Sequence, residues 1–149
     1  MTEHHLELVA CRRDGSLASA CERPRDIDDA CAATAGMYDR LGFEPPWIGY
    51  IAVVDGTAVG GGAFVGPPAD GRVEIAYFTQ PDRQGKGLAT RIARALVDIA
   101  RRHAPGIEIH AKTLPEANAS THILRGLGFR RSGTAHDHEI GEAWAWSLR

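Results

Sequence analysis

The stretch Gln84-Gly85-Lys86-Gly87-Leu88-Ala89 decides the fold, because it joins two segments with different periodicity. Residues 73–78 before it alternate between apolar and mixed positions, which is typical of a strand. After it, apolar residues recur at helical spacing from Leu88 to Ile99, and Pro105-Gly106 ends the pattern. The chain therefore passes from a strand through a glycine turn into a long amphipathic helix.

A glycine turn at the start of a helix is suited to bind an anion. The first helical turn has N–H groups without a partner inside the helix, and the helix dipole adds partial positive charge there. Gly85 and Gly87 carry no side chain that would keep a phosphate away from these groups. The sequence thus predicts a phosphate or pyrophosphate site at this turn.

Spacing separates the possible phosphate-binding loops. A P-loop requires G-x-x-x-x-G-K-[ST], but Lys86 is followed by Gly87 and the residue five positions before Gly85 is Gln80. A nicotinamide-binding fingerprint would need a third glycine where Thr90 stands, and Glu108 lies at the front of the next strand instead of its end. The P-loop is excluded, and a nicotinamide site stays a distant alternative.

Three blocks of the sequence resemble the GNAT N-acetyltransferases. The turn matches their signature Q/R-x-x-G-x-G/A. Residues 114–129, which end in Leu127-Gly128-Phe129, are similar to the family's last helix. Residues 141–148 resemble the closing strand of the branch that includes the ribosomal-protein N-terminal acetyltransferases. The three blocks follow one another in the family's order through the C-terminal half of the chain.

The fold expected is an α/β (α+β) domain that spans residues 1–149. Periodicity predicts the order β, α, three strands, α, β, α, β, β, with a hairpin at Asp55-Gly56 between strands 47–54 and 57–65. The resemblance implies a mixed, mostly antiparallel sheet of about seven strands with flanking helices. It also implies that the fourth and fifth strands run parallel and splay apart.

The resemblance further implies that acetyl-CoA is the cosubstrate and that no metal is needed. Main-chain groups near the end of the fourth strand would bond the pantetheine arm, and the N–H groups of the turn would hold the pyrophosphate. The residues expected to bind acetyl-CoA are Tyr77, Phe78, Thr79, Gln84, Gly85, Lys86, Gly87, Leu88, Ala89, Thr90 and Asn118.

Acetyl transfer to an amine needs a base, because an alkylammonium with a pKa of about 10.4 is almost fully protonated at neutral pH. Glu74, on the strand before the turn, is the leading candidate, and His110 on the next strand is its rival. Many family members use a tyrosine to protonate the leaving thiolate, but Leu124 occupies that position here. Asn118 and Ser120 are therefore expected to stabilise the thiolate by hydrogen bonds.

The acceptor is expected to be a primary amine of a small molecule or a peptide. Its pocket would be built from the first helix, the following loop and the middle strands, with Tyr38, Trp47 and Tyr50 as contacts and Phe43 and Glu44 nearby. The alternative is an acyl-CoA-binding sensor or scaffold without catalytic activity. The missing tyrosine and the unproven base keep that alternative open.

Composition limits the other possibilities. With 149 residues and 44% hydrophobic content, the chain is large enough for one domain with its own core. A net charge of −2 without a basic stripe argues against nucleic acid as a partner. No apolar run approaches about 18 residues, and residues 1–5 lack a signal-peptide pattern, so no membrane partner and a cytoplasmic location are expected.

Other reactive residues are expected to be structural. The three cysteines, Cys11, Cys21 and Cys31, form no C-x-x-C pair and are interpreted as reduced thiols. The histidines of residues 136–139 are expected in a solvated turn rather than in a metal site. Trp144, Trp146 and Leu148 share one face of the last strand, where they could pack internally or form the seam of a possible homodimer.

Overall fold

A computed structural model of the chain describes residues 5–137 and 140–149. Its secondary structure follows the predicted order. The strands are β1 (Leu6–Ala10), β2 (Gly49–Val54), β3 (Thr57–Phe64), β4 (Arg72–Thr79), β5 (Glu108–Thr113), β6 (Arg130–Asp137) and β7 (Gly141–Leu148). The helices are α1 (Arg25–Leu41), α2 (Leu88–His103) and α3 (Ala119–Gly126), with a 3-10 turn η1 at Pro81–Arg83.

The strands form one seven-stranded sheet in the order β1-β2-β3-β4-β5-β7-β6. All neighbouring pairs are antiparallel except β4 and β5, which are parallel. The mixed, mostly antiparallel sheet is therefore confirmed. None of the helices in the part of the chain that the structure describes is long and apolar enough to cross a membrane.

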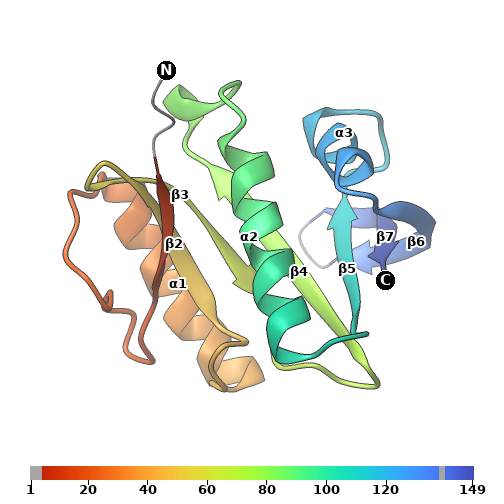
Figure 1. Cartoon of the computed structure of the whole chain (residues 1–149), viewed down its shortest axis with the longest axis horizontal. Coiled ribbons are helices and arrows are strands. Elements are labelled where there is room, and N and C mark those ends of the chain that lie inside the picture. Colours follow the sequence, from red (N-terminus) through yellow and green to blue (C-terminus); the bar gives the residue numbers. More distant parts are fainter. Residues whose placement is uncertain (1–4, 138–139) are drawn as a thin grey trace.

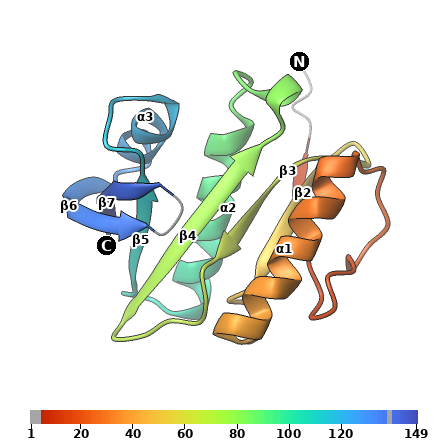
Figure 2. The same ribbon diagram turned by 180° about the vertical axis from the view of Figure 1, so that it is seen from behind.

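Helices α1 and α2 cover opposite faces of the sheet (Figures 1 and 2). Helix α2 packs closely on β3 because Gly60 and Gly62 present no side chain to it. A Cβ on Gly62 would come within 2.8 Å of both Ile92 and Leu96. These two side chains are fully buried and belong to the larger core cluster, between α2 and the sheet.

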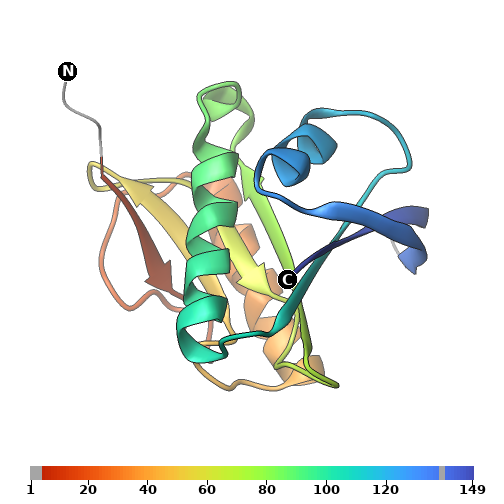
Figure 3. The ribbon, with the colours of Figure 1, turned by 45° about the vertical axis from the view of Figure 1, so that its right-hand side comes forward.

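Strands β4 and β5 separate after a short paired region. Only three residue pairs join them, from Arg72↔Glu108 to Glu74↔His110, although β4 continues to Thr79. Beyond this point the two strands diverge as the arms of a V, with the start of α2 near its open end (Figures 1 and 3). The expected splay is confirmed, and it leaves unpaired main-chain groups on the two facing edges.

Two element boundaries differ from the prediction. Strand β2 begins at Gly49 rather than at Trp47, because the N–H groups of Trp47 and Ile48 make turn hydrogen bonds to Glu44 and Pro46. The last helix is shorter than the block at 114–129, since Asn118 caps it and residues 114–118 precede it as a loop.

The final strand packs its aromatic residues inward. Trp146 is fully buried and donates a hydrogen bond from Nε1 to the Thr113 hydroxyl at 2.9 Å. Trp144 is half-buried beneath Arg131, whose guanidinium lies 3.9 Å from the ring centroid. The expected homodimer stays a prediction, and Trp146 is not available for its seam.

The cysteines are free thiols, and Cys11 and Cys31 are buried. Burial raises the pKa of Cys11 to about 12, which removes its thiolate at neutral pH. His136 lies on β6, whereas His138 and Glu139 fall outside the described residues, as does the stretch 1–4.

Candidate active site

A cleft of about 550 Å³ lies where the end of β4, the start of α2 and the start of α3 come together. The elements that line it, β4, α2 and α3, lie around the open end of the V (Figure 3). Nine of the residues expected to bind acetyl-CoA line it, together with four residues of α3 and Arg83. The residues of the first group are Tyr77, Phe78, Thr79, Gln84, Gly85, Gly87, Leu88, Ala89 and Thr90, without Lys86 and Asn118.

The Gln84 side chain connects the glycine turn to the end of β4. Its side-chain Nε2 donates a hydrogen bond to the Thr79 carbonyl oxygen at 3.4 Å. Gly85 and Gly87 both adopt positive φ angles, +80° and +76°, and an ideal Cβ on either would meet no heavy atom within 4 Å. Their Cβ positions therefore face open space at the cleft, where an anion can approach the main chain.

The first turn of α2 supplies the hydrogen-bond donors. Gly87 is the N-cap, and no side chain caps the helix. The N–H groups of Leu88, Ala89 and Thr90 precede the first bonds within the helix and point toward its N-terminal end. Three donors and the helix dipole thus converge on the region that the two glycines leave open.

Thr79 provides an independent sign that a polar ligand belongs in the cleft. Its hydroxyl Oγ1 is buried and has no hydrogen-bond partner among the described residues. A buried hydroxyl without a partner costs free energy, and a ligand amide or hydroxyl in the cleft would satisfy it. The residues present therefore fit the pantetheine arm and pyrophosphate of acetyl-CoA.

Helix α3 contributes Ser120 and His122 to the wall of the cleft. Asn118 has a different position: it caps α3, and its Oδ1 accepts a hydrogen bond from the Thr121 N–H at 3.0 Å. Leu124 is fully buried in the core. Ser120 therefore borders the cleft, whereas the side-chain oxygen of Asn118 is engaged as the cap of α3.

A second cavity of about 450 Å³ lies on the α1 face of the sheet. It shares Tyr77 and Phe78 with the first cleft, so the two spaces meet at one wall near the end of β4. Tyr50 lines this cavity as expected for the acceptor side, and its hydroxyl donates to the Pro46 carbonyl oxygen at 2.7 Å.

The other two residues expected at the acceptor pocket lie elsewhere. Tyr38 is only 1% exposed, and its hydroxyl donates to the Cys11 carbonyl oxygen and accepts from the Gly49 N–H, both at 2.8 Å. Trp47 packs edge-to-face on Phe64, with ring centroids 5.1 Å apart. Phe64 belongs to the core cluster beneath α2, so Trp47 lies away from the α1-side cavity. Both side chains therefore have structural contacts in place of the expected ones.

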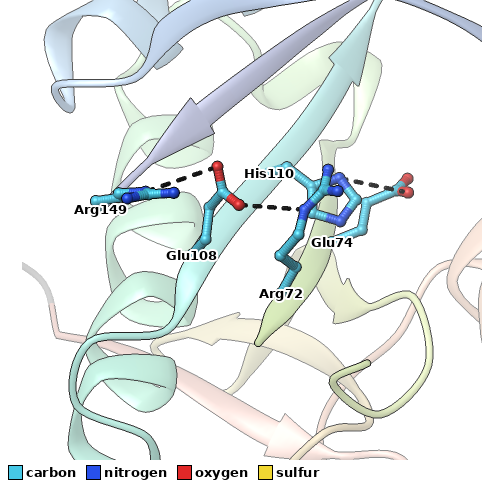
Figure 4. Close-up of polar contacts among 5 residues, drawn as sticks. All are labelled: Arg72, Glu74, Glu108, His110 and Arg149. Atoms are coloured by element: carbon cyan, nitrogen blue, oxygen red, sulfur yellow. Dashed lines mark ion pairs between the residues drawn. The ribbon is translucent and has the colours of Figure 1, made fainter. Parts of the chain in front are cut away.

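Glu74 lies at the point where β4 and β5 separate, opposite His110 in the strand register. Its Oε1 is 3.5 Å from Lys112 Nζ and 4.0 Å from His110 Nδ1. Figure 4 shows Glu74 and His110 beside a second charged group, in which Glu108 lies between Arg72 and Arg149. Ion pairs thus join β4 to β5 at the paired end of the V, from Arg72 to Glu108 and from Glu74 to Lys112.

Glu74 lines neither the cleft nor the α1-side cavity, but a third hollow. Glu74 and His110 line a hollow of about 250 Å³ at the closed end of the V. Ala76, two residues further along the same strand face, lines the α1-side cavity. Burial lowers the pKa of His110 below 6.5, so its imidazole is neutral and able to accept a proton at neutral pH.

Tyr77 has a feature that sequence reasoning missed. Its main chain was expected to bind the cosubstrate, but Tyr77 also borders the α1-side cavity. Burial raises the pKa of Tyr77 to about 12, so the phenol stays protonated and can donate a hydrogen bond at any physiological pH. Strand alternation alone could not show that Tyr77 borders two cavities, because the cavities depend on elements distant in the sequence.

The described residues contain no group of three or more histidine, cysteine, aspartate or glutamate side chains that could hold a metal ion.

A parallel strand pair that splays at a glycine-turn helix defines the acyl-CoA acyltransferase type of fold. A family model described as an acetyltransferase (GNAT) domain matches residues 1–130. The chain belongs to this GNAT acetyltransferase family.

Relatives and solved structures agree with this assignment. The uncharacterized N-acetyltransferase p20 of Bacillus licheniformis is 33% identical over 70 residues, which are 47% of this chain and 39% of that protein. Ribosomal-protein-S5-alanine acetyltransferase of Vibrio fischeri has a similar structure, with a TM-score of 0.70 and 14% identity over 99% of this chain and 93% of that one.

A Salmonella typhimurium protein solved with its cofactor acetyl-CoA is also similar in structure. The TM-score is 0.65 at 20% identity, and the match covers 99% of this chain and 94% of that one. At these identities the two structures support the fold alone. This chain matches only 39% of the length of the curated relative, so that relative adds only a name of the same class.

Proposed function

We propose that this chain transfers the acetyl group of acetyl-CoA to a primary amine of a small molecule or peptide, by direct attack within a ternary complex. The observation that carries the proposal is the wall shared by the two cavities. The cleft fits the cosubstrate, the α1-side cavity offers a separate space, and Tyr77 and Phe78 border both. An amine that enters from the α1 side would therefore approach a thioester without displacing it.

The proposed base is Glu74, acting directly or through a water molecule. It shares a strand face with Ala76 of the α1-side cavity, and the strand rise places the two residues about 7 Å apart along β4. This separation favours a bridging water. His110, which is neutral and lies 4.0 Å from Glu74, is the alternative acceptor of the proton.

The departing thiolate would be stabilised by hydrogen bonds in place of the usual tyrosine. Ser120 from α3 and Tyr77 from β4 are both lining residues of the cleft, and each carries a hydroxyl that can donate. A thiol with a pKa of about 8.5 leaves without a strong acid, so such donors are sufficient. Asn118 keeps its proposed place near the cosubstrate through its position at the start of α3.

The test is acceptor-dependent release of the CoA thiol, measured with a panel of amines and short peptides. Glu74→Gln is expected to lower kcat about 100-fold or more, because removal of a general base costs roughly this factor. Glu108→Gln is the matched control: it alters a carboxylate on the same face of the V that is engaged by Arg72 and Arg149. This control should retain activity close to wild type.

The outcomes separate the proposals. Full activity of Glu74→Gln together with inactive His110→Gln would move the base to His110. Binding of acetyl-CoA without thiol release for any acceptor would support the sensor or scaffold function instead. The cytoplasmic location and the absence of nucleic-acid and membrane partners remain predictions from the sequence.

A further inference from the structure

The α1-side cavity has an apolar wall and one charged side chain. Its lining from α1 consists of residues at helical spacing, namely Ala30, Ala33, Thr34, Met37 and Arg40. The strands add Tyr50, Ile51, Gly62, Ala63, Ala76, Tyr77 and Phe78. No acidic side chain is among these lining residues. A ligand that fills this cavity thus meets hydrocarbon and aromatic surface with a single cation at one end.

The charged side chain of this cavity is Arg40, and its guanidinium is available to bind a ligand. Its guanidinium folds back along α1, with Nη1 3.8 Å from the position that a Cβ on Gly36 would take. No hydrogen bond or ion pair engages this guanidinium among the residues that the structure describes, and the side chain is exposed. By contrast, Lys112 and Arg72 near the V are already paired with Glu74 and Glu108.

The geometry points to an acceptor amine that carries a carboxylate on an apolar body, with the carboxylate bound by Arg40. This inference rests on the proposed function, because it names the substrate class of the same site. A guanidinium binds a carboxylate through two parallel hydrogen bonds, which fixes the orientation of the molecule. The amine at the other end of the body then faces the wall of Tyr77 and Phe78. A second cationic group near Arg40 would be repelled.

The size of the cavity is consistent with this class. About 450 Å³ lies within the range of small-molecule pockets and accommodates a ring or short aliphatic chain with both polar ends. Met37 can adjust its unbranched side chain to different apolar bodies. The carboxylate is therefore expected to select the acceptor more strictly than the shape of its apolar part.

Thiol release should be compared for 4-(aminomethyl)benzoate and its neutral isostere 4-(aminomethyl)benzamide. The expected ratio of kcat/KM is between about tenfold and 100-fold in favour of the carboxylate, the range for a charge-assisted hydrogen bond. Arg40→Gln should reduce the ratio to near one, and Arg40→Lys should restore part of it. Arg40→Glu should instead favour the cationic 4-(aminomethyl)benzamidine.

Arg102→Gln is the matched control, because Arg102 is also an exposed arginine in the last turn of a helix but lies outside both cavities. It should leave the ratio unchanged. An equal ratio in wild type and Arg40→Gln would overturn the inference.

A measurement without turnover separates this inference from the proposed function. Calorimetry with 4-methylbenzoate, which has the carboxylate and ring but no amine, should show binding to the CoA-loaded chain that is about tenfold or more weaker in Arg40→Gln. This binding is expected even if no amine is acetylated. Binding that is unaffected by Arg40→Gln, or undetectable in wild type at about 10 mM, would contradict the inference while thiol release from other amines still supported the proposed function.

Discussion

Gly87 and Gly85 show how a residue without a side chain can define a binding site. Both have left-handed backbone angles, and neither has a heavy atom within 4 Å of its ideal Cβ position. The folded chain therefore does not need glycine at these positions for packing. Two reasons remain: the left-handed conformation itself, and the close approach of a ligand to the main chain.

Gly87→Ala separates these two reasons. The left-handed conformation costs about 1–2 kcal/mol for a residue with a Cβ, so the free energy of unfolding should fall by roughly this amount. In addition, the methyl group should weaken acetyl-CoA binding about tenfold or more, because it occupies space that the pyrophosphate needs. Chemical denaturation measures the first effect and calorimetry the second.

Gly106→Ala is the control for Gly87→Ala. Gly106 follows α2 at its opposite end, has a φ of +86° and likewise has no heavy atom within 4 Å of its Cβ position. It should show a similar loss of stability with unchanged acetyl-CoA affinity. If both variants bound acetyl-CoA as the wild type does, the assignment of the pyrophosphate to this turn would be wrong.

Single residues differ in how far the sequence predicts their place. The glycine turn was predictable because its function depends on spacing and main-chain geometry. Tyr38 was not, because the core-facing residues of α1 and its cavity-lining residues, such as Met37, are neighbours in the sequence. An arginine such as Arg40 in a last helical turn is ordinarily explained by the helix dipole, so only the fold shows that it borders a cavity.

At the scale of elements, the V between β4 and β5 is the decisive feature. Strand alternation puts Glu108, His110 and Lys112 on one face of β5, and the alternating burial of this strand agrees. It could not provide the register that puts Glu74 opposite His110, since register depends on contacts between distant segments. The splay itself was expected only from the family resemblance.

His110, where β4 and β5 pair, should make the free energy of unfolding depend on pH. Burial lowers its pKa in the folded state below 6.5, while Glu74 and Glu108 oppose this shift and Arg72 and Lys112 add to it. The unfolded chain then binds the proton more readily. The stability is complete when His110 is neutral, and it falls as the pH drops through 6.5 toward the folded pKa.

His110→Gln is expected to flatten the dependence of Tm on pH between about 5 and 7.5, because it removes this titration. The control is His103→Gln, at the exposed end of α2, which should retain the wild-type profile. An unchanged slope in His110→Gln would show that another group near the V accounts for the acid sensitivity.

At the scale of the whole molecule, the predicted order of elements was confirmed because periodicity and turn residues are local signals. The hairpin at Asp55-Gly56 is one example, with both residues at positive φ. The two cavities could not be derived in the same way, since the cleft requires β4, α2 and α3 to meet and the α1-side cavity requires α1, β2, β3 and β4 to meet. Only their glycine-turn component is continuous in the sequence.

Acetyl-CoA should therefore stabilise the whole domain, because its proposed site joins β4, α2 and α3, which contribute separately to the cleft. At a concentration of about 100 Kd the expected gain is about 2.7 kcal/mol. For a domain of about 150 residues this corresponds to a rise in Tm of roughly 5–10 °C. Thermal unfolding followed by circular dichroism measures it.

NAD is the discriminating control for this stabilisation, since its pyrophosphate could approach the same helix but its nicotinamide half has no counterpart to a pantetheine arm. It should raise Tm far less than acetyl-CoA at equal concentration, and Gly87→Ala should reduce the acetyl-CoA effect at a fixed ligand concentration. An equal or larger rise with NAD would instead revive the nicotinamide alternative and remove the reason to place an acyl donor between β4 and β5. The measurement of Tm thus tests two features together, the splay of β4 and β5 and the glycine turn, because a stabilisation specific to acetyl-CoA requires both.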